Sequence, residues 1–429
     1  MNIATLGLWH LGTVTSACLA SVGHRVVAFD HDAQLIDDLR ACRLPVAEPG
    51  LSELTRVNLD AGTLRFSSDP RDLADAQILW VTYDTPVDEN DVADVEYVVT
   101  RVAAIFAHLR EDALVLISSQ MPVGSTRQLA ELYVRAVPQG HVSFAYSPEN
   151  LRLGKALDVF LHPDRVVVGT RTESDRARIA QMFQPITDKI EWMSVESAEM
   201  TKHALNAFLA TSVTFINEIA SLCERVGADA REVERGLKSE ARIGPKAYLR
   251  PGGAFAGGTL ARDIAFLVEI GRAQNTPTNL LTAVRTSNDE HKNWARRALA
   301  HTFGDLSGKT IAVLGLTYKP GTDTLRRSSA VELCDWLHKQ DSRVVAFDPA
   351  IKSLPDELAY IKLSDSIESA LHNADAAIIA TECPEFLATN ADTLVRVMRQ
   401  PILLDASRFL DKNLGRDVRV HYIAVGKAE

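Results

Sequence analysis

Six residues near the start of the chain, Gly7-Leu8-Trp9-His10-Leu11-Gly12, have the spacing of a turn that binds a dinucleotide. In such a turn the first glycine makes the bend, and the last lets the helix pack closely on the strand. The middle position, where the backbone approaches a pyrophosphate, holds Trp9 instead of glycine. Asp30 follows Gly7 by 23 residues, where a carboxylate hydrogen-bonds a ribose 2′-hydroxyl and repels a 2′-phosphate. The pattern predicts an NAD site made of Gly7, Trp9, His10, Leu11, Gly12 and Asp30, with a purely structural turn as the alternative.

The elements that would position this turn form a β-α-β unit. Residues 3–8 are a short apolar run, residues up to 20 suit a helix packed on a sheet, and residues 26–30 form a second apolar run. The same pattern of two apolar runs recurs at residues 311–316 and 344–348. Further strands are expected at residues 78–82, 114–118, 142–146, 376–380 and 402–405. Such units bury parallel sheets, so the pattern predicts a doubly wound domain at each end of the chain.

The middle of the chain has a different spacing of apolar residues. Residues 195–227 have apolar side chains at helical spacing and almost no helix breakers. We therefore expect an α/β fold in which two Rossmann-like, doubly wound domains are joined by a helical middle domain with a long central helix. The expected boundaries are 1–194, 195–300 and 301–429. The long helix has two open interpretations, a subunit interface or a core element.

Composition narrows the class of protein. The net charge is −10, from 46 basic and 56 acidic residues, which argues against a nucleic-acid or anionic-membrane protein. Five scattered cysteines without C-x-x-C spacing indicate a reducing compartment and no metal site. We expect neither a signal peptide nor a membrane-spanning segment. These features predict a soluble, cytoplasmic protein.

Short motifs spread over more than 300 residues resemble those of the UDP-glucose/GDP-mannose dehydrogenase family. They are Thr85-Pro86, Ser147-Pro148-Glu149, Pro163-Asp164-Arg165, Asn206-Ala207-Phe208-Leu209-Ala210, Arg242-Ile243-Gly244, the run 255–263, and Tyr318-Lys319-Pro320 leading to Arg326. The resemblance covers nearly the whole chain. It implies NAD-dependent oxidation of the 6-alcohol of a nucleotide sugar to a carboxylate, in a homodimer whose C-terminal domain binds the nucleotide sugar.

The resemblance also implies catalytic roles. Lys202 and Asp263 match the lysine and aspartate that organise a water or base for the alcohol proton. Asn206 matches an asparagine that helps to hold an oxyanion, and it follows Lys202 by four residues on one helix face. Glu149 matches a glutamate near the nicotinamide and the sugar. Without the resemblance, Lys202 would be a solvated lysine, Asp263 a helix cap and Glu149 a loop carboxylate.

Other matches imply ligand contacts. Thr85 and Arg326 match NAD-binding residues, and Arg262 replaces a family lysine while keeping its charge. On the substrate side, Arg242 matches an arginine that commonly reaches the neighbouring subunit's site, Lys319 a substrate-binding lysine, and Gly257 a glycine of a ligand-binding loop. Arg327 stands where the family has an acidic residue.

The main departure is at the nucleophile. Aligned on Phe255 and Asp263, the family cysteine corresponds to Thr259, and none of the five cysteines lies near it in sequence. Gln120 likewise replaces a family threonine that positions water. A threonine hydroxyl is far less acidic than a thiol, so the usual thioester route for the second oxidation is closed. Three outcomes stay open: oxidation stops at the aldehyde, the aldehyde hydrate is oxidised directly, or the chain only binds.

Two functions of other classes remain beside the dehydrogenase. One is an isomerase or epimerase that keeps its NAD and returns the hydride to the sugar. The other is a non-catalytic nucleotide-sugar-binding homologue. The sequence leaves the sugar and the nucleotide open.

Overall fold

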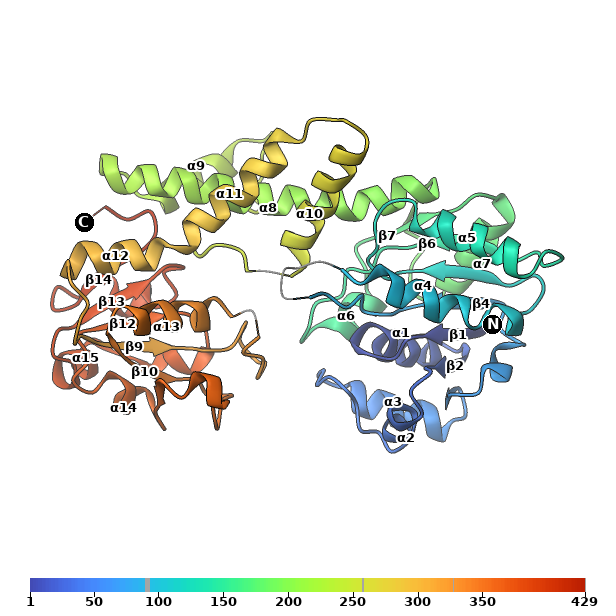
Figure 1. Cartoon of the computed structure of the whole chain (residues 1–429), viewed down its shortest axis with the longest axis horizontal. Coiled ribbons are helices and arrows are strands. Elements are labelled where there is room, and N and C mark those ends of the chain that lie inside the picture. Colours follow the sequence, from blue (N-terminus) through green and yellow to red (C-terminus); the bar gives the residue numbers. More distant parts are fainter. Residues whose placement is uncertain (89–92, 257, 327, 429) are drawn as a thin grey trace. The chain divides into compact units, whose positions relative to one another are not determined.

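The computed structural model describes residues 1–88, 93–256, 258–326 and 328–428. The chain forms two compact units, Met1–Ala204 and Leu205–Glu429, and each contains one sheet with helices packed on it (Figure 1).

The sheet of the first unit has the strand order β3-β2-β1-β4-β5-β6-β7-β8. Its pairs are parallel except β6 with β7, which are antiparallel. The strands are β1 (Asn2–Leu6), β2 (Arg25–Phe29), β3 (Leu64–Ser67), β4 (Ile78–Val81), β5 (Leu114–Ile117), β6 (Ser143–Tyr146), β7 (Val166–Gly169) and β8 (Ile190–Met193). The helices are α1 (His10–Ser21), α2 (Ala33–Arg40), α3 (Leu51–Asp60), α4 (Val95–Ala103), α5 (Ser125–Ala136), α6 (Ala156–Leu161) and α7 (Glu173–Phe183), with 3₁₀ turns η1 (Pro70–Leu73) and η2 (Phe106–His108).

Burial on both faces explains why these strands are continuous apolar runs. In β4, Leu79 and Val81 pack into one hydrophobic cluster, while Ile78 and Trp80 pack into another. Alternate side chains of a strand point to opposite faces, so each face of the sheet has its own core under the helices.

The sheet of the second unit has the order β11-β10-β9-β12-β13-β14, with every pair parallel. Its strands are β9 (Thr310–Leu314), β10 (Arg343–Phe347), β11 (Ile361–Leu363), β12 (Ala376–Ile379), β13 (Ile402–Asp405) and β14 (His421–Ile423). The helices around it are α13 (Ser329–Lys339), α14 (Ile367–Leu371), α15 (Ala391–Val397) and α16 (Asp411–Leu414), with 3₁₀ turns η3 (Asp356–Leu358) and η4 (Pro384–Ala388). The order 3-2-1-4-5-6, shared with the first six strands of the other sheet, is that of a doubly wound dinucleotide-binding domain. The predicted fold class is therefore confirmed.

Helices occupy the middle of the chain. They are α8 (Val195–Val226), α9 (Ala230–Ser239), α10 (Thr259–Ala273), α11 (Asn279–Lys292) and α12 (Trp294–Phe303). The predicted long helix is confirmed as α8, one unbroken element (Figure 1). It ends before Gly227, whose φ of +76° leaves the helical region.

One expectation about α8 stays a prediction. We expected no segment able to span a membrane, yet α8 is long and apolar enough by length and composition. The reason is that apolar side chains cover more than its core-facing side, and Phe208 and Phe215 are exposed. This is weak evidence for a span, because the core helix of a soluble protein passes the same test.

Candidate active site

The predicted cofactor turn joins β1 to α1. Gly7 has a φ of +96°, which ends β1 at Leu6, and a side chain there would meet the Tyr83 ring at 2.5 Å. A side chain at Gly12 would lie 1.8 Å from the Gly7 carbonyl oxygen. Both positions therefore require glycine, as in a strand that passes directly into a helix beneath a bound pyrophosphate.

The residues between these glycines differ in their surroundings. Trp9 precedes α1 without a capping hydrogen bond, and its side chain is exposed. His10 Nε2 lies 3.0 Å from Glu48 Oε2, and Leu11 is buried. The turn keeps the tight bend and the helix start of an NAD site. It carries the Trp9 indole at the position where the usual motif has a glycine without a side chain.

Asp30 lies at the carboxyl end of β2. Its carboxylate accepts hydrogen bonds from the backbone N–H of Leu8 at 2.9 Å and of Asp32 at 3.1 Å. A carboxylate has about four acceptor positions, so two remain for a ribose. Asp30 thus fits NAD and also fastens the cofactor turn to β2.

The predicted residue Thr85 lies in the loop after β4, and Gln120, which replaces a family threonine, lies in the loop after β5. Thr85 Oγ1 donates a hydrogen bond to the Gln120 carbonyl oxygen at 2.8 Å, and both residues are buried. Ligands of doubly wound folds bind at the carboxyl ends of the strands, and both loops lie at that edge.

Lys202 and Glu149 form a partly buried pair in the first unit. Lys202 Nζ donates to the Glu149 carbonyl oxygen at 2.6 Å and lies 3.2 Å from Glu149 Oε1. The second carboxylate oxygen of Glu149 accepts the Leu151 N–H at 2.9 Å. Lys202 is 6% exposed, so it is not the solvated helix lysine of the alternative interpretation. The pair holds an ammonium group beside a carboxylate, an arrangement suited to moving a proton.

Asn206 and Asp263 form a second pair, in the second unit. The Asn206 side-chain amide donates to Asp263 Oδ2, and Asp263 is completely buried. Asp263 is the fifth residue of α10, whose N-cap is Gly258, so Asp263 is not a helix cap. Asn206 follows Lys202 by one turn of α8.

Thr259 is the first residue of α10 and is exposed, and Arg262 lies one turn further along the helix. Burial makes Cys18 and Cys334 poor substitutes for the nucleophile. All five cysteines are free, and burial raises the pKa of Cys18 and of Cys334 to about 12. A thiol of that pKa is not ionised near neutral pH, and thiolate is the reactive form.

The remaining predicted residues are near the surface. The Arg242 side chain is 87% exposed and its Nε pairs with Glu240 at 3.0 Å. Lys319 is half-buried and Arg326 is exposed, both between β9 and α13. Gly257 and Arg327 lie outside the described residues.

Glu48 is a buried residue that sequence reasoning missed. Besides His10, it accepts the backbone N–H of Gly154 at 2.9 Å and of Ala156 at 2.8 Å. It therefore links the cofactor turn to the loop that begins at Glu149. Burial alone would raise the pKa of Glu48, but the hydrogen bonds from Ala156 and Gly154 lower it below its ordinary value. No periodicity in the sequence marks this residue.

Glu199 was also missed. It lies one turn before Lys202 on α8, and its carboxylate accepts the N–H groups of Gly124 at 2.6 Å and Thr126 at 2.9 Å. It thereby caps the start of α5 and ties it to α8.

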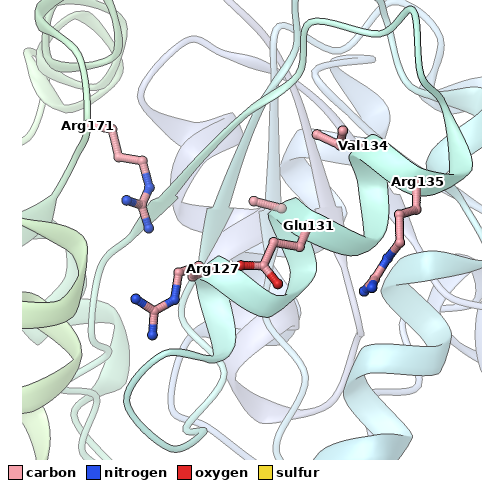
Figure 2. A pocket seen from close by; sticks show the side chains of 6 residues that line it. Arg127, Glu131, Val134, Arg135 and Arg171 are labelled. Atoms are coloured by element: carbon pink, nitrogen blue, oxygen red, sulfur yellow. The ribbon is translucent and has the colours of Figure 1, made fainter.

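A separate hollow on the first unit lies along α5. Figure 2 shows Arg127, Glu131, Val134 and Arg135 on this helix, with Arg171 across from them. Arg171 pairs with Glu196 at 2.9 Å. None of the hollow's residues is a predicted site residue, so the hollow is not part of the candidate site.

Comparisons with known proteins agree along the whole chain. Residues 1–187 match the NAD-binding domain of the UDP-glucose/GDP-mannose dehydrogenase family, residues 196–290 its central domain, and residues 312–412 its UDP-binding domain. The chain is 33% identical over 435 residues to UDP-glucose 6-dehydrogenase YwqF of Bacillus subtilis, covering 100% of this chain and 98% of that protein. It is also 33% identical over 438 residues to the UDP-glucose 6-dehydrogenase of Rhizobium meliloti, covering all of both chains.

Structural comparison gives the same result. The fold is similar to that of a UDP-glucose dehydrogenase from Pyrobaculum islandicum, with a TM-score of 0.88 and 27% identity over 100% of this chain and 98% of that one. The predicted resemblance and the predicted cofactor are confirmed. The chain belongs to the UDP-glucose/GDP-mannose dehydrogenase family and is an NAD-dependent nucleotide-sugar dehydrogenase.

Proposed function

We propose that this enzyme oxidises the 6-alcohol of a UDP-glucose-like nucleotide sugar to the aldehyde, and that its second oxidation is slow or absent. The observation that carries the proposal is a retained set of polar pairs, Lys202 with Glu149 and Asn206 with Asp263, in a chain that has a threonine at position 259. The relatives named above are UDP-glucose 6-dehydrogenases, which is why a UDP-glucose-like substrate is proposed.

The first oxidation needs a proton acceptor and a place for NAD. NAD would supply the acceptor for the C6 hydride, and the residues that would hold it are Gly7, Trp9, His10, Leu11, Gly12, Asp30, Thr85, Arg262 and Arg326. Lys202 and Asp263 organise the water or base that takes the O6 proton. Asn206 donates to the oxygen as its negative charge develops, and Glu149 keeps the Lys202 ammonium in place.

The second oxidation needs a tetrahedral adduct of the aldehyde. A thiolate forms one readily because the pKa of a thiol is near 8.5, about the working pH of an enzyme. The Thr259 hydroxyl does not ionise in that range, and an ester with it would be stable. An acid therefore arises only through the aldehyde hydrate, with water held by Lys202 and Asp263.

The same proposal includes the substrate contacts. Lys319, Arg242 and Gly257 bind the nucleotide sugar, and its diphosphate accounts for the two cations. The exposed Arg242 side chain is suited to serve the site of a second copy of the chain.

A homodimer through α8 is part of the proposal. Phe208, Phe215, Leu222 and Val226 are exposed, and the first three are seven residues apart. Spacing by sevens places side chains on one face of a helix, where they form an apolar stripe that a second copy would cover.

We also propose domain boundaries of 1–194, 195–300 and 301–429, near those of the family's three parts. Five free cysteines support a reducing compartment such as the cytoplasm.

The proposal is tested with a panel of nucleotide sugars and NAD, measuring NADH release and the product mass. We expect NADH with a UDP-hexose and a product two mass units lighter, or its hydrate. An isomerised sugar without NADH would support the isomerase instead, and tight binding without chemistry would support the non-catalytic homologue.

A further inference from the structure

The glycine-rich loop before α10 is fixed by side chains from two helices of the second unit. Asn217 of α8 accepts the Gly252 N–H at 3.0 Å and donates to the Gly253 carbonyl oxygen at 3.2 Å. His291 of α11 lies with its Nε2 2.8 Å from the Gly252 carbonyl oxygen. Both backbone groups of Gly252 are therefore occupied.

Asn288 of α11 holds the next turn of the same loop. Its Oδ1 accepts the Phe255 N–H at 2.9 Å, and its Nδ2 donates to the Phe255 carbonyl oxygen at 2.9 Å. Asn288 and His291 are three residues apart, so they lie on one face of α11. The three side chains are 2%, 3% and 7% exposed for Asn217, Asn288 and His291, which means that losing a partner would leave buried polar groups unsatisfied.

The His291 ring is held as a hydrogen-bond donor. A carbonyl oxygen only accepts, so Nε2 carries the proton in this contact. Burial lowers the pKa of His291, opposed by the hydrogen bond to Gly252, so the ring is neutral near pH 7.

These anchors bear on the proposed active site through their place in the chain. Thr259 follows Phe255 by four residues and precedes Asp263 by four. Phe255 is fixed by Asn288, and Asp263 is fixed by Asn206. The segment with Thr259 is therefore anchored at both ends.

We propose that Asn217, Asn288 and His291 are positioning residues that hold the loop 252–256 in its substrate-binding conformation before the nucleotide sugar arrives. This inference rests on the proposed function, in which Gly257, the residue directly after this loop, binds the nucleotide sugar. A loop with Gly252 and Gly253 samples many conformations when free, and each residue that must be ordered on binding weakens the affinity roughly tenfold. Anchoring the loop in advance removes that loss.

The kinetic test measures the KM of each variant for the nucleotide sugar at a constant NAD concentration. It also measures the KM for NAD at a constant sugar concentration. We expect Asn288→Ala and Asn217→Ala to raise the KM for the nucleotide sugar about tenfold or more, since each removes two hydrogen bonds. The KM for NAD should change less than the KM for the sugar, because most of the proposed NAD contacts belong to the first unit and only Arg262 and Arg326 to the second. Thr286→Ala, an exposed residue two positions before Asn288, is the matched control and should leave both constants unchanged.

A rescue pair separates positioning from simple structural damage. His291→Gln keeps an N–H donor for the Gly252 carbonyl oxygen, while His291→Leu fills similar space without one. We expect His291→Gln to keep a nearly normal KM and His291→Leu to raise it. If both variants lower only the melting temperature and the active fraction, with the KM for the sugar unchanged, the positioning role is wrong.

Amide hydrogen exchange tests the anchors without relying on activity. Peptides covering residues 250–256 should exchange at least tenfold faster in ligand-free Asn288→Ala and Asn217→Ala than in the wild type or Thr286→Ala. If the wild type oxidises no nucleotide sugar, the proposed function fails, while this exchange experiment still decides whether the loop is anchored. Unchanged exchange, or an unchanged KM in an active enzyme, would overturn the inference.

Discussion

Replacing Asp30 with asparagine should change which cofactor the enzyme prefers. The Asp30 carboxylate is 8% exposed, and in the wild type a 2′-phosphate would come within hydrogen-bonding range of this buried negative charge. Two unit charges 4 Å apart repel by about 4 kcal/mol at an effective dielectric constant of 20. With relaxation of the site, about 3 kcal/mol is a reasonable expectation, which is roughly a hundredfold in relative kcat/KM.

The ratio of kcat/KM for NAD to that for NADP is the quantity to measure. The asparagine side chain of the variant would still offer an oxygen to the Leu8 N–H, and any damage to the turn affects both cofactors and cancels in the ratio. We expect Asp30→Asn to lower the ratio by roughly a hundredfold. Asp32→Asn, which alters the adjacent N-cap of α2, is the control and should leave the ratio unchanged. A ratio for Asp30→Asn within threefold of the wild type would refute the reasoning.

Three other predictions concern assembly, thiols and acid. Phe215→Glu places a charge on the exposed stripe of α8 and should convert the dimer to a monomer, as measured by light scattering. A wild-type protein that is monomeric and fully active at micromolar concentration would contradict the proposed interface. Iodoacetamide should leave wild-type activity intact, since burial raises the pKa of Cys18 to about 12, but it should inactivate an active Thr259→Cys enzyme; rapid inactivation of the wild type would mean that a cysteine serves the reaction. Glu48→Gln should destabilise the protein by about 1–3 kcal/mol at pH 7. The pKa of Glu48 is lowered in the folded state, so its contribution is complete above its ordinary value of 4.5 and is lost as the pH falls further. The unfolding temperatures of the two proteins should therefore converge as the pH falls below 4.5, and a difference that does not depend on pH would show that the Glu48 charge is not responsible.

Much of the fold could be predicted because it repeats. The two β-α-β units and the segment near residues 78–82 contain continuous apolar runs, which are typical of a sheet buried on both faces. In the structure these runs form β1, β2, β4, β9 and β10. The strands that were not predicted are β3, β7, β8, β11 and β14. All of them except β7 lie at a sheet edge, and these edge strands are short and mixed in polarity.

The site could be predicted only in part, because its contacts join distant segments. Lys202 and Asn206 share one helix, which local spacing reveals, but Glu149 is 53 residues from Lys202 in the chain. Asn217 is a polar residue of α8, and nothing local in the sequence indicates that it holds a loop 35 residues away. Likewise Glu48 contacts Ala156 over 108 residues. Such long-range hydrogen bonds produce no periodic pattern of residue types in the sequence.

The most direct test of the proposed reaction measures how many NADH molecules form per sugar oxidised. Limiting UDP-glucose, or the nucleotide sugar that the panel identifies, is incubated with excess NAD, and NADH and product are quantified with the aldehyde trapped by hydroxylamine. Because Thr259 cannot form a thiohemiacetal, we predict one NADH per sugar in the fast phase, a trapped aldehyde, and a fast phase that is largely intact in Thr259→Ala. Two NADH per sugar without detectable aldehyde, together with loss of both steps in Thr259→Ala, would contradict the account and give the Thr259 hydroxyl a catalytic role.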